Sequence, residues 1–181
     1  VIPRLTLSKV KNLKATPDAK SIKFTWNKVT GAESYEVQYS TNGKKWTKVK
    51  ATKNSATIKK LKAGTTYKVK VKAIAGSNNG AFSSVLTTST EPVKVNVTKV
   101  TSTKSKQITV NWKKISGVTG YEVQYSTAKN FKKNTKTVTI KKQSTVKTTL
   151  KKLTKGKKYY IRVRAYKTVG KVKIVGDEEE E

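Results

Sequence analysis

The chain has 181 residues and a formal net charge of +31, with 41 lysine and arginine residues against ten aspartate and glutamate residues. It contains no cysteine and no histidine, which excludes disulfide frameworks, Cys or His metal clusters, thiol nucleophiles and histidine bases. A hydrophobic content of 34% allows two modest cores. No apolar run approaches the roughly 20 residues of a membrane span, so membrane insertion is not expected. Because the sequence begins at Val1 and lacks methionine, we expect it to be a piece of a longer protein.

The first half of the chain predicts several short strands and no sustained helix. Apolar and polar residues alternate over 22–26, 35–39 and 67–73, so each run has one buried and one exposed face. A last strand is expected over 85–89. The turns between these runs contain Thr30-Gly31, Asn42-Gly43, Ala63-Gly64 and Asn79-Gly80. Short strands separated by such turns indicate a β-sandwich.

The second half repeats the first. The heptapeptide Tyr-Glu-Val-Gln-Tyr-Ser-Thr occurs at 35–41 and again at 121–127, and Trp26 and Trp112 precede the two copies at the same spacing. Alternation returns over 108–112, 121–125 and 159–165. A period of about 90 residues is that of a whole small domain, so the chain is read as two copies of one module.

The two copies are expected to join at Glu91-Pro92, because proline biases the preceding residue toward extended backbone. The predicted organisation is an N-terminal extension at 1–7, a first domain at 8–90, a short linker at 91–92, a second domain at 93–176 and an acidic tail at 177–181.

These landmarks resemble fibronectin type III domains. The resemblance rests on an early-strand tryptophan, a Tyr-x-Val-x-Tyr strand and a Leu-x-x-Gly-x-x-Tyr corner at 61–67 and 153–159, which occur in the same order twice. It is closest to the lysine-rich versions found in surface and secreted proteins of Gram-positive bacteria. It implies an all-β fold of two tandem seven-stranded sandwiches, with strands A, B and E facing C′, C, F and G. Tyr67 and Tyr159 would each cap a backbone group in the loop before its strand.

The end of the second copy departs from the first. Gly80-Ala81-Phe82-Ser83 leads into the last strand of the first copy, whereas Gly176 is followed by one aspartate and four glutamates. Because runs of like charge are not expected to pair as a strand, only a stub at 171–175 is predicted, which leaves an open edge along 161–165. The end is read as processed or artificial, or else as an edge covered by a neighbouring chain through Ile2, Leu5 and Leu7.

The acidic residues do not suggest catalysis. Glu36 and Glu122 hold the same outward position in the two repeats, so no carboxylate pair is predicted within one domain. They are expected to form cross-strand ion pairs with Lys68 and Lys70 in one domain and with Arg162 and Arg164 in the other. The sequence contains no phosphate-binding glycine loop, nucleophile elbow or metal-ligand spacing. We therefore expect no enzyme activity, no cofactor and no metal.

A candidate binding patch consists of aromatic and basic side chains that alternation places on the outer sheet faces. Trp46 and Phe131 are expected to occupy comparable places in the two copies. The alternative interpretation is that these aromatic rings and lysine stems only cover a sheet face and bind no ligand. The patch comprises Tyr160, Arg162, Arg164, Tyr166, Trp46, Lys68, Lys70 and Lys72.

Only Arg4, Arg162 and Arg164 among the 41 basic residues are arginine, and lysine acts as a point charge without the fork that selects a particular phosphate or base. Weak binding to polyanions or glycans of the cell envelope is therefore expected, without specific nucleic-acid recognition. The leading hypothesis is a non-enzymatic spacer and interaction module of an extracellular bacterial surface or secreted protein. The alternatives are adhesion to an anionic polymer, such as teichoic acid, an acidic glycan or nucleic acid, and a role as accessory domains of a secreted polysaccharide-degrading enzyme.

Overall fold

The computed structural model describes residues 6–180, with the backbone alone at 179 and 180. All regular secondary structure within this range is β-strand, so the all-β prediction is confirmed. Over the same range, no helix has the length and apolar character of a membrane span. The chain divides into two compact units, Val1–Thr90 and Glu91–Glu181.

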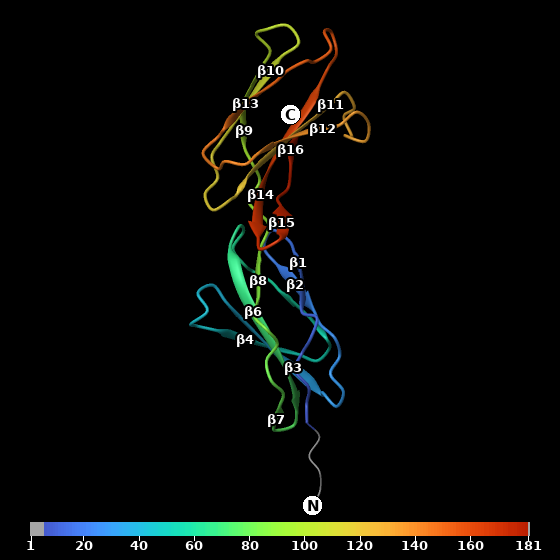
Figure 1. The fold of residues 1–181 in the computed structure, drawn as a ribbon, viewed down its shortest axis with the longest axis vertical. Coiled ribbons are helices and arrows are strands. Elements are labelled where there is room, and N and C mark those ends of the chain that lie inside the picture. Colours follow the sequence, from blue (N-terminus) through green and yellow to red (C-terminus); the bar gives the residue numbers. More distant parts are fainter. Residues whose placement is uncertain (1–5, 181) are drawn as a thin grey trace, which may run out of the picture. The chain divides into compact units, whose positions relative to one another are not determined.

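The first unit contains two antiparallel sheets (Figure 1). The smaller sheet has the order β1-β2-β5, and the larger has β4-β3-β6 with β7 and β8 both paired to β6. This is the predicted arrangement of strands A, B and E opposite C′, C, F and G, with strand G divided in two. The strands are β1 Lys14–Pro17, β2 Ile22–Thr25, β3 Ser34–Ser40, β4 Thr47–Ala51, β5 Ser55–Ile58, β6 Thr66–Ala75, β7 Asn78–Asn79 and β8 Leu86–Ser89.

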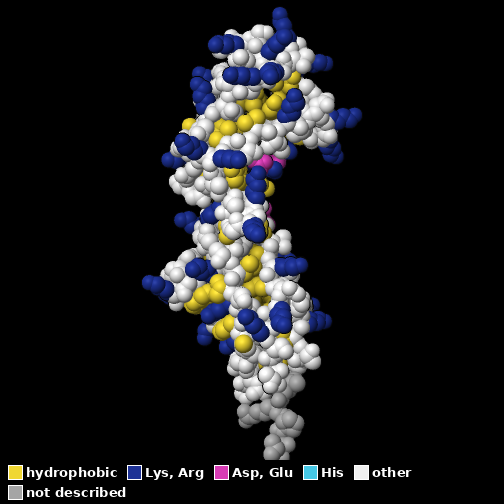
Figure 2. Space-filling view, viewed as in Figure 1, with side chains coloured by type: hydrophobic (Ala, Val, Ile, Leu, Met, Phe, Trp, Pro, Cys, Tyr) yellow, Lys and Arg dark blue, Asp and Glu magenta, His cyan; other side chains and the backbone are white. Residues whose placement is uncertain are grey.

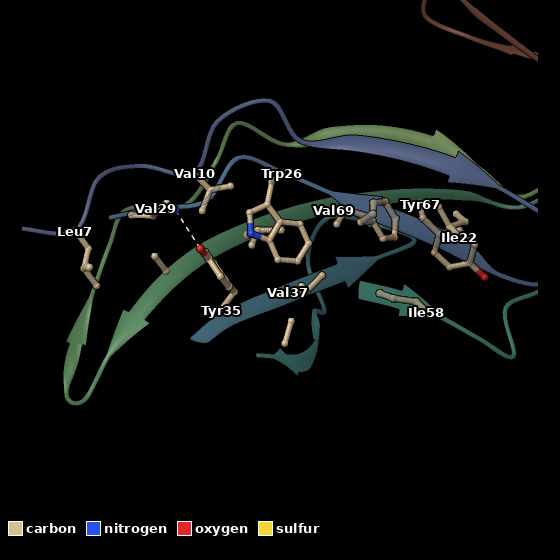
Figure 3. Packing of buried hydrophobic residues seen from close by; sticks show 14 of the residues in the cluster. Leu7, Val10, Ile22, Trp26, Val29, Tyr35, Val37, Ile58, Tyr67 and Val69 are labelled. Carbon is tan, nitrogen blue, oxygen red and sulfur yellow. Dashed lines mark hydrogen bonds between the residues drawn. The ribbon is translucent and has the colours of Figure 1, made fainter. Parts of the chain in front are cut away.

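The core of the first unit is built around Trp26, which is 3% exposed. Its ring meets Tyr35 edge to face, with centroids 5.3 Å apart and planes at 69°. The Tyr35 hydroxyl accepts a hydrogen bond of 3.0 Å from the Val29 N–H (Figure 3). Leu7, which the sequence assigned to an extension, is also buried in this core.

The second unit has the same two sheets. Its smaller sheet has the order β13-β10-β9, and its larger sheet has β12-β11-β14-β15, with β16 also paired to β14. Trp112 is again 3% exposed and lies 5.4 Å from Tyr121 between ring centroids, so the two tryptophans occupy equivalent cores as predicted. The strands are β9 Val97–Thr101, β10 Ile108–Trp112, β11 Gly120–Ser126, β12 Lys136–Ile140, β13 Lys147–Leu150, β14 Tyr160–Val169, β15 Val172–Val175 and β16 Glu179–Glu180.

Both corner tyrosines perform the predicted structural role. The Tyr67 hydroxyl accepts a hydrogen bond of 3.1 Å from the Lys62 N–H, and the Tyr159 hydroxyl accepts one of 2.9 Å from the Thr154 N–H. Each bond satisfies a loop donor and fixes the loop against the strand that follows it.

The prediction that the acidic residues would not pair as a strand is wrong for Glu179 and Glu180. The Gly176 N–H donates to the Ala165 carbonyl at 2.9 Å, and β16 then pairs Glu179 with Val163 and Glu180 with Arg162. Most of the edge that was expected to be open is therefore covered by the same chain. The physical reason is that Glu178, which directly precedes β16, pairs with Arg162 and Arg164 of β14, and the sequence rule did not consider these opposite charges.

The expected covering of that edge by the N-terminal segment also needs correction. Leu7 is 7% exposed in the core of the first unit, so its side chain is not available to fill a groove elsewhere. Ile2 and Leu5 lie outside the described residues.

Candidate functional site

Strand β14 presents the predicted outward row of the second unit. Tyr160, Arg162, Arg164 and Tyr166 share the outer face because side chains alternate along the strand, and they lie opposite four residues of β11: Ser126, Gln124, Glu122 and Gly120.

The Arg162 guanidinium contacts three neighbouring side chains of the same unit. Its Nε donates to Gln124 Oε1 at 2.7 Å, its Nη1 lies 3.0 Å from Glu178 Oε2, and its Cζ lies 4.2 Å from the centre of the Phe131 ring. A hydrogen bond, a carboxylate and a ring thus engage two of its nitrogens and one of its faces within the unit.

Arg164 is engaged in the same way by two carboxylates. Its Nη1 lies 2.9 Å from Glu178 Oε1, and its Nη2 lies 3.4 Å from Glu122 Oε2. Glu122 also pairs with Lys173 at 2.7 Å. The predicted pair between Glu122 and Arg164 is confirmed, whereas Arg162 bonds Gln124 and Glu178 in place of Glu122.

This arrangement shifts the titration of Glu122, whose side chain is 8% exposed. Burial opposes ionisation, but the hydrogen bond from Lys173 and the charges of Arg164 and Lys173 outweigh it and hold the pKa of Glu122 below its ordinary value. Glu122 is therefore a structural anion and is not poised as a general acid near neutral pH.

The two tyrosines of the row each contact a lysine. The Lys158 Nζ lies 5.1 Å from the centre of the Tyr160 ring, and the Lys173 Nζ lies 4.4 Å from that of Tyr166. Tyr166 is 5% exposed and lies over Gly120, where an added Cβ would come 3.0 Å from the tyrosine hydroxyl. The four residues of the predicted row therefore share one face, and the rings of Tyr160 and Tyr166 lie close to lysines of the same unit.

The corresponding face of the first unit brings together Lys70, Trp46 and Phe82. The Lys70 Nζ lies 4.4 Å from the centre of each ring. Since Phe131 contacts Arg162 in the second unit as Trp46 contacts Lys70 in the first, the predicted equivalence of Trp46 and Phe131 is confirmed.

The predicted partners of Glu36, Lys68 and Lys70, are wrong. The observed partner is Lys72, the next outward-facing residue along β6. Glu36 lies directly opposite Lys72 in the register of β3 and β6, and Glu36 Oε2 is 3.4 Å from the Lys72 Nζ. Lys72 also lies 5.1 Å from the centre of the Phe82 ring. Lys68 is exposed beside the Gly43 turn and forms no ion pair among the described side chains.

Sequence reasoning missed a second candidate site, which lies at one end of the second unit. Two adjoining hollows of about 280 and 390 Å³ are lined by lysines from two loops and from the start of β12. The signal was present in the repeat itself, because several of these lysines replace neutral or acidic residues of the first copy. Among the side chains that the structure describes, no three His, Cys, Asp or Glu residues come together as a metal site.

The sequence matches known proteins over nearly its whole length. The fibronectin type III domain family matches residues 8–89 and again 90–174. The chain belongs to this family. Its two fibronectin type III domains are similar to the two-domain segment of chicken tenascin, at 19% identity over 95% of this chain and 97% of that one, with a TM-score of 0.48. They are also similar to the FN1–FN3 domains of chicken CNTN1, at 21% identity over 96% of this chain and 66% of that one, with a TM-score of 0.50. At this level of identity the similarity is one of fold.

Proposed function

We propose that this pair of fibronectin type III domains is a non-enzymatic spacer and interaction module of an extracellular bacterial surface or secreted protein. Tandem domains of this family commonly serve as interaction or spacer modules. The observation that carries the proposal is that Arg162 and Arg164, the arginines of the outer sheet face, are paired with Glu178 of the same domain. Such faces stabilise a module without preparing it for chemistry.

The remaining surface supports separation from neighbours. The large hydrophobic side chains exposed among the described residues are the valines Val85, Val93, Val100 and Val172, which is little apolar material for a docking surface. On the face drawn in Figure 2, Lys and Arg side chains are spread over both domains and few Asp or Glu side chains are visible. A surface of one sign repels other copies and protects exposed strand edges from pairing.

A display experiment tests the spacer proposal. The chain is placed between an epitope and a cell-surface anchor, and antibody access to the epitope is compared with that given by an unrelated fibronectin type III pair of low charge. A spacer predicts equal access for the two pairs and reduced access when either domain is deleted. A difference in antibody access between this chain and the unrelated pair would contradict the proposal.

Adhesion to an anionic polymer is a second candidate function. The net charge of +31 favours it, because each lysine that neutralises an anionic group releases a condensed counterion. Binding of the purified chain to polyanions is measured at about 0.15 M salt, where charges more than about 8 Å apart are largely screened. Binding that persists at this salt concentration supports local adhesion, and binding that is lost indicates diffuse attraction.

A further inference from the structure

One end of the second domain contains two hollows that share a wall. The first, of about 280 Å³, lies between the loop that joins β9 to β10 and the loop that precedes β14, and is lined by Lys104, Lys106, Lys155 and Lys157 among others. Figure 1 shows these loops beyond β10, in yellow-green and orange-red. The second hollow, of about 390 Å³, is lined by Lys136, Lys152 and Lys157 with part of the β11–β12 loop. The wall common to both is formed by Leu153, Thr154, Lys157 and Tyr159.

The lining of both hollows is entirely without negative charge. It contains six lysines and no aspartate or glutamate, and all six lysines are exposed. None of the ion pairs between described side chains involves them, in contrast to Arg162 and Arg164. Hydroxyl and amide groups that can donate to an anion line the same walls, namely Ser102, Thr103, Ser105, Gln107, Thr127, Asn134 and Thr154.

The first domain shows that the fold does not require these lysines. The Leu61 N–H donates to the Lys20 carbonyl at 2.8 Å, and the Leu153 N–H donates to the Lys106 carbonyl at 3.1 Å, so the same bond ties the loops in both domains. Around this common frame the charges differ. Asp18, Thr47, Ala63 and Thr65 stand in the first domain where the second has Lys104, Lys136, Lys155 and Lys157.

The aromatic rings at this end restrict the kind of anion that fits. Tyr125 and Tyr159 contact each other with centroids 6.4 Å apart and planes at 54°, and the Tyr159 hydroxyl already accepts the Thr154 N–H. Because the two half-buried rings contact each other, less of their surface remains for the stacking of a base or sugar. Point charges and hydroxyl donors instead suit the oxygens of phosphate groups.

We propose that this end of the second domain binds a linear polymer that carries phosphate groups without stacking rings, with successive phosphates held in the two hollows. The shared wall lets one chain pass from the first hollow to the second over Thr154 and Lys157. The inference deepens the second candidate function above and rests on it, because it gives polyanion adhesion a defined place on the molecule.

The titration of Tyr159 is consistent with a positive potential at this place. The hydrogen bond from the Thr154 N–H, together with the charges of Lys136 and Lys157, lowers the pKa of Tyr159. A field that favours the phenolate also favours a bound phosphate.

The test compares two variants of equal charge change. The site variant carries Lys104→Asp, Lys136→Thr, Lys155→Ala and Lys157→Thr, which are the residues that the first domain has at these places. The control carries Lys113→Asp, Lys114→Ala, Lys141→Ala and Lys142→Thr, at exposed positions near the opposite end of the same domain. Affinity for long-chain inorganic polyphosphate is measured by calorimetry at several salt concentrations, after melting curves have shown that both variants fold.

We expect the site variant to lose at least about tenfold in affinity at about 0.15 M salt, and its salt slope to fall by about 2 to 3. The control should lose less than about twofold. The reverse change, Asp18→Lys with Thr47→Lys, Ala63→Lys and Thr65→Lys, should create a second site in the first domain and raise the stoichiometry.

The other outcomes overturn different parts of the inference. Equal losses in the two variants would remove the site but leave diffuse polyanion binding. No binding by the unmodified chain at about 0.15 M salt would remove both the site and the adhesion candidate. Charge-matched single-stranded DNA or heparin oligosaccharide that binds as tightly, and fails on the same variant, would show that the ligand class is wrong.

Discussion

Phe82 of the first domain and Glu178 of the second occupy the same position on their sheets. Each is the second residue after a glycine that donates its N–H to the neighbouring strand, at 2.8 Å from Gly80 and 2.9 Å from Gly176. The chain leaves the turn in the same direction in both domains, so these two side chains reach over the same two positions of the sheet.

The basic residues that these two side chains contact are lysines in the first domain and arginines in the second. The phenyl ring lies 4.4 Å from Lys70 and 5.1 Å from Lys72, whereas the carboxylate lies 3.0 Å from Arg162 and 2.9 Å from Arg164. A ring face attracts an ammonium group, and a carboxylate bridges two guanidinium groups well because each has several donors in a plane. The arginines of the body of the chain are therefore explained by an internal contact.

The double variant Arg162→Ala with Arg164→Ala is accordingly predicted to leave polyanion binding nearly unchanged. Glu178 and Glu122 already neutralise both guanidiniums, so their removal should change affinity by less than about twofold at about 0.15 M salt. Calorimetric titration with polyphosphate measures this, with the lysine site variant as the comparison. A tenfold loss would instead assign the ligand to the β14 row.

Trp26→Ala and Trp112→Ala are each predicted to destabilise mainly the domain that carries them. Both rings are 3% exposed, and replacing a buried tryptophan by alanine costs about 3 to 5 kcal/mol, a large share of a small domain's stability. Differential scanning calorimetry should show one transition moved down and the other nearly unchanged. The half-buried Trp46 is the control, since Trp46→Ala should cost less than about 1.5 kcal/mol. Equal shifts of both transitions for either core variant would show that the domains do not unfold independently.

The strands and the two cores could be predicted because their signal is local. Alternation fixed the faces of β2, β3 and β6, and the repeat transferred each assignment to the second copy. The hydrogen bonds that the Tyr35 and Tyr121 hydroxyls accept from the Val29 and Ile115 N–H groups were not predicted, although their spacing is the same in both copies. A tyrosine hydroxyl finds its partner across a turn, and its reach depends on turn geometry that alternation does not specify.

The contacts of the acidic segment could not be predicted from its composition. A rule about like charges considers the segment alone, whereas the outcome depends on which side chains lie across the sheet from it. Glu36 shows the same limit, because its partner changes from Lys70 to Lys72 with the register of one strand pair. Aligning Gly80 with Gly176 would have placed Glu178 over the arginines, so the repeat held part of this information.

Tyr67→Phe is predicted to cost more stability than Tyr159→Phe. Each change removes the acceptor of one loop N–H, at about 1 kcal/mol for a typical bond and more where the donor is left buried. The bond to Tyr67 is partly buried, whereas the bond to Tyr159 is exposed, so water can replace the second hydroxyl more easily. Urea unfolding of each single variant, followed domain by domain, measures the difference. A larger cost at Tyr159 would mean that water does not reach the Thr154 N–H.

Glu122→Gln is predicted to reduce the acid sensitivity of the second domain. The carboxylate is 8% exposed and accepts from Lys173 at 2.7 Å, and its pKa lies below the ordinary glutamate value of 4.5. Because the folded state holds this proton less tightly than the unfolded state, the carboxylate stabilises the domain above about pH 4.5. That contribution is lost as the pH falls through the lower pKa of the folded state.

The variant should therefore be less stable than the unmodified chain at pH 7, by about 1 to 2 kcal/mol for a charge-assisted hydrogen bond. The difference should shrink as the pH falls below about 4.5. Thermal melts of the second domain between neutral and acidic pH measure it. Glu36→Gln provides the control in the first domain, where the side chain is 20% exposed and pairs with Lys72 at the longer distance of 3.4 Å, so the same effect should be smaller. If the stability difference between the Glu122→Gln variant and the unmodified chain stays constant down to acid pH, Glu122 does not cause the acid dependence of its domain.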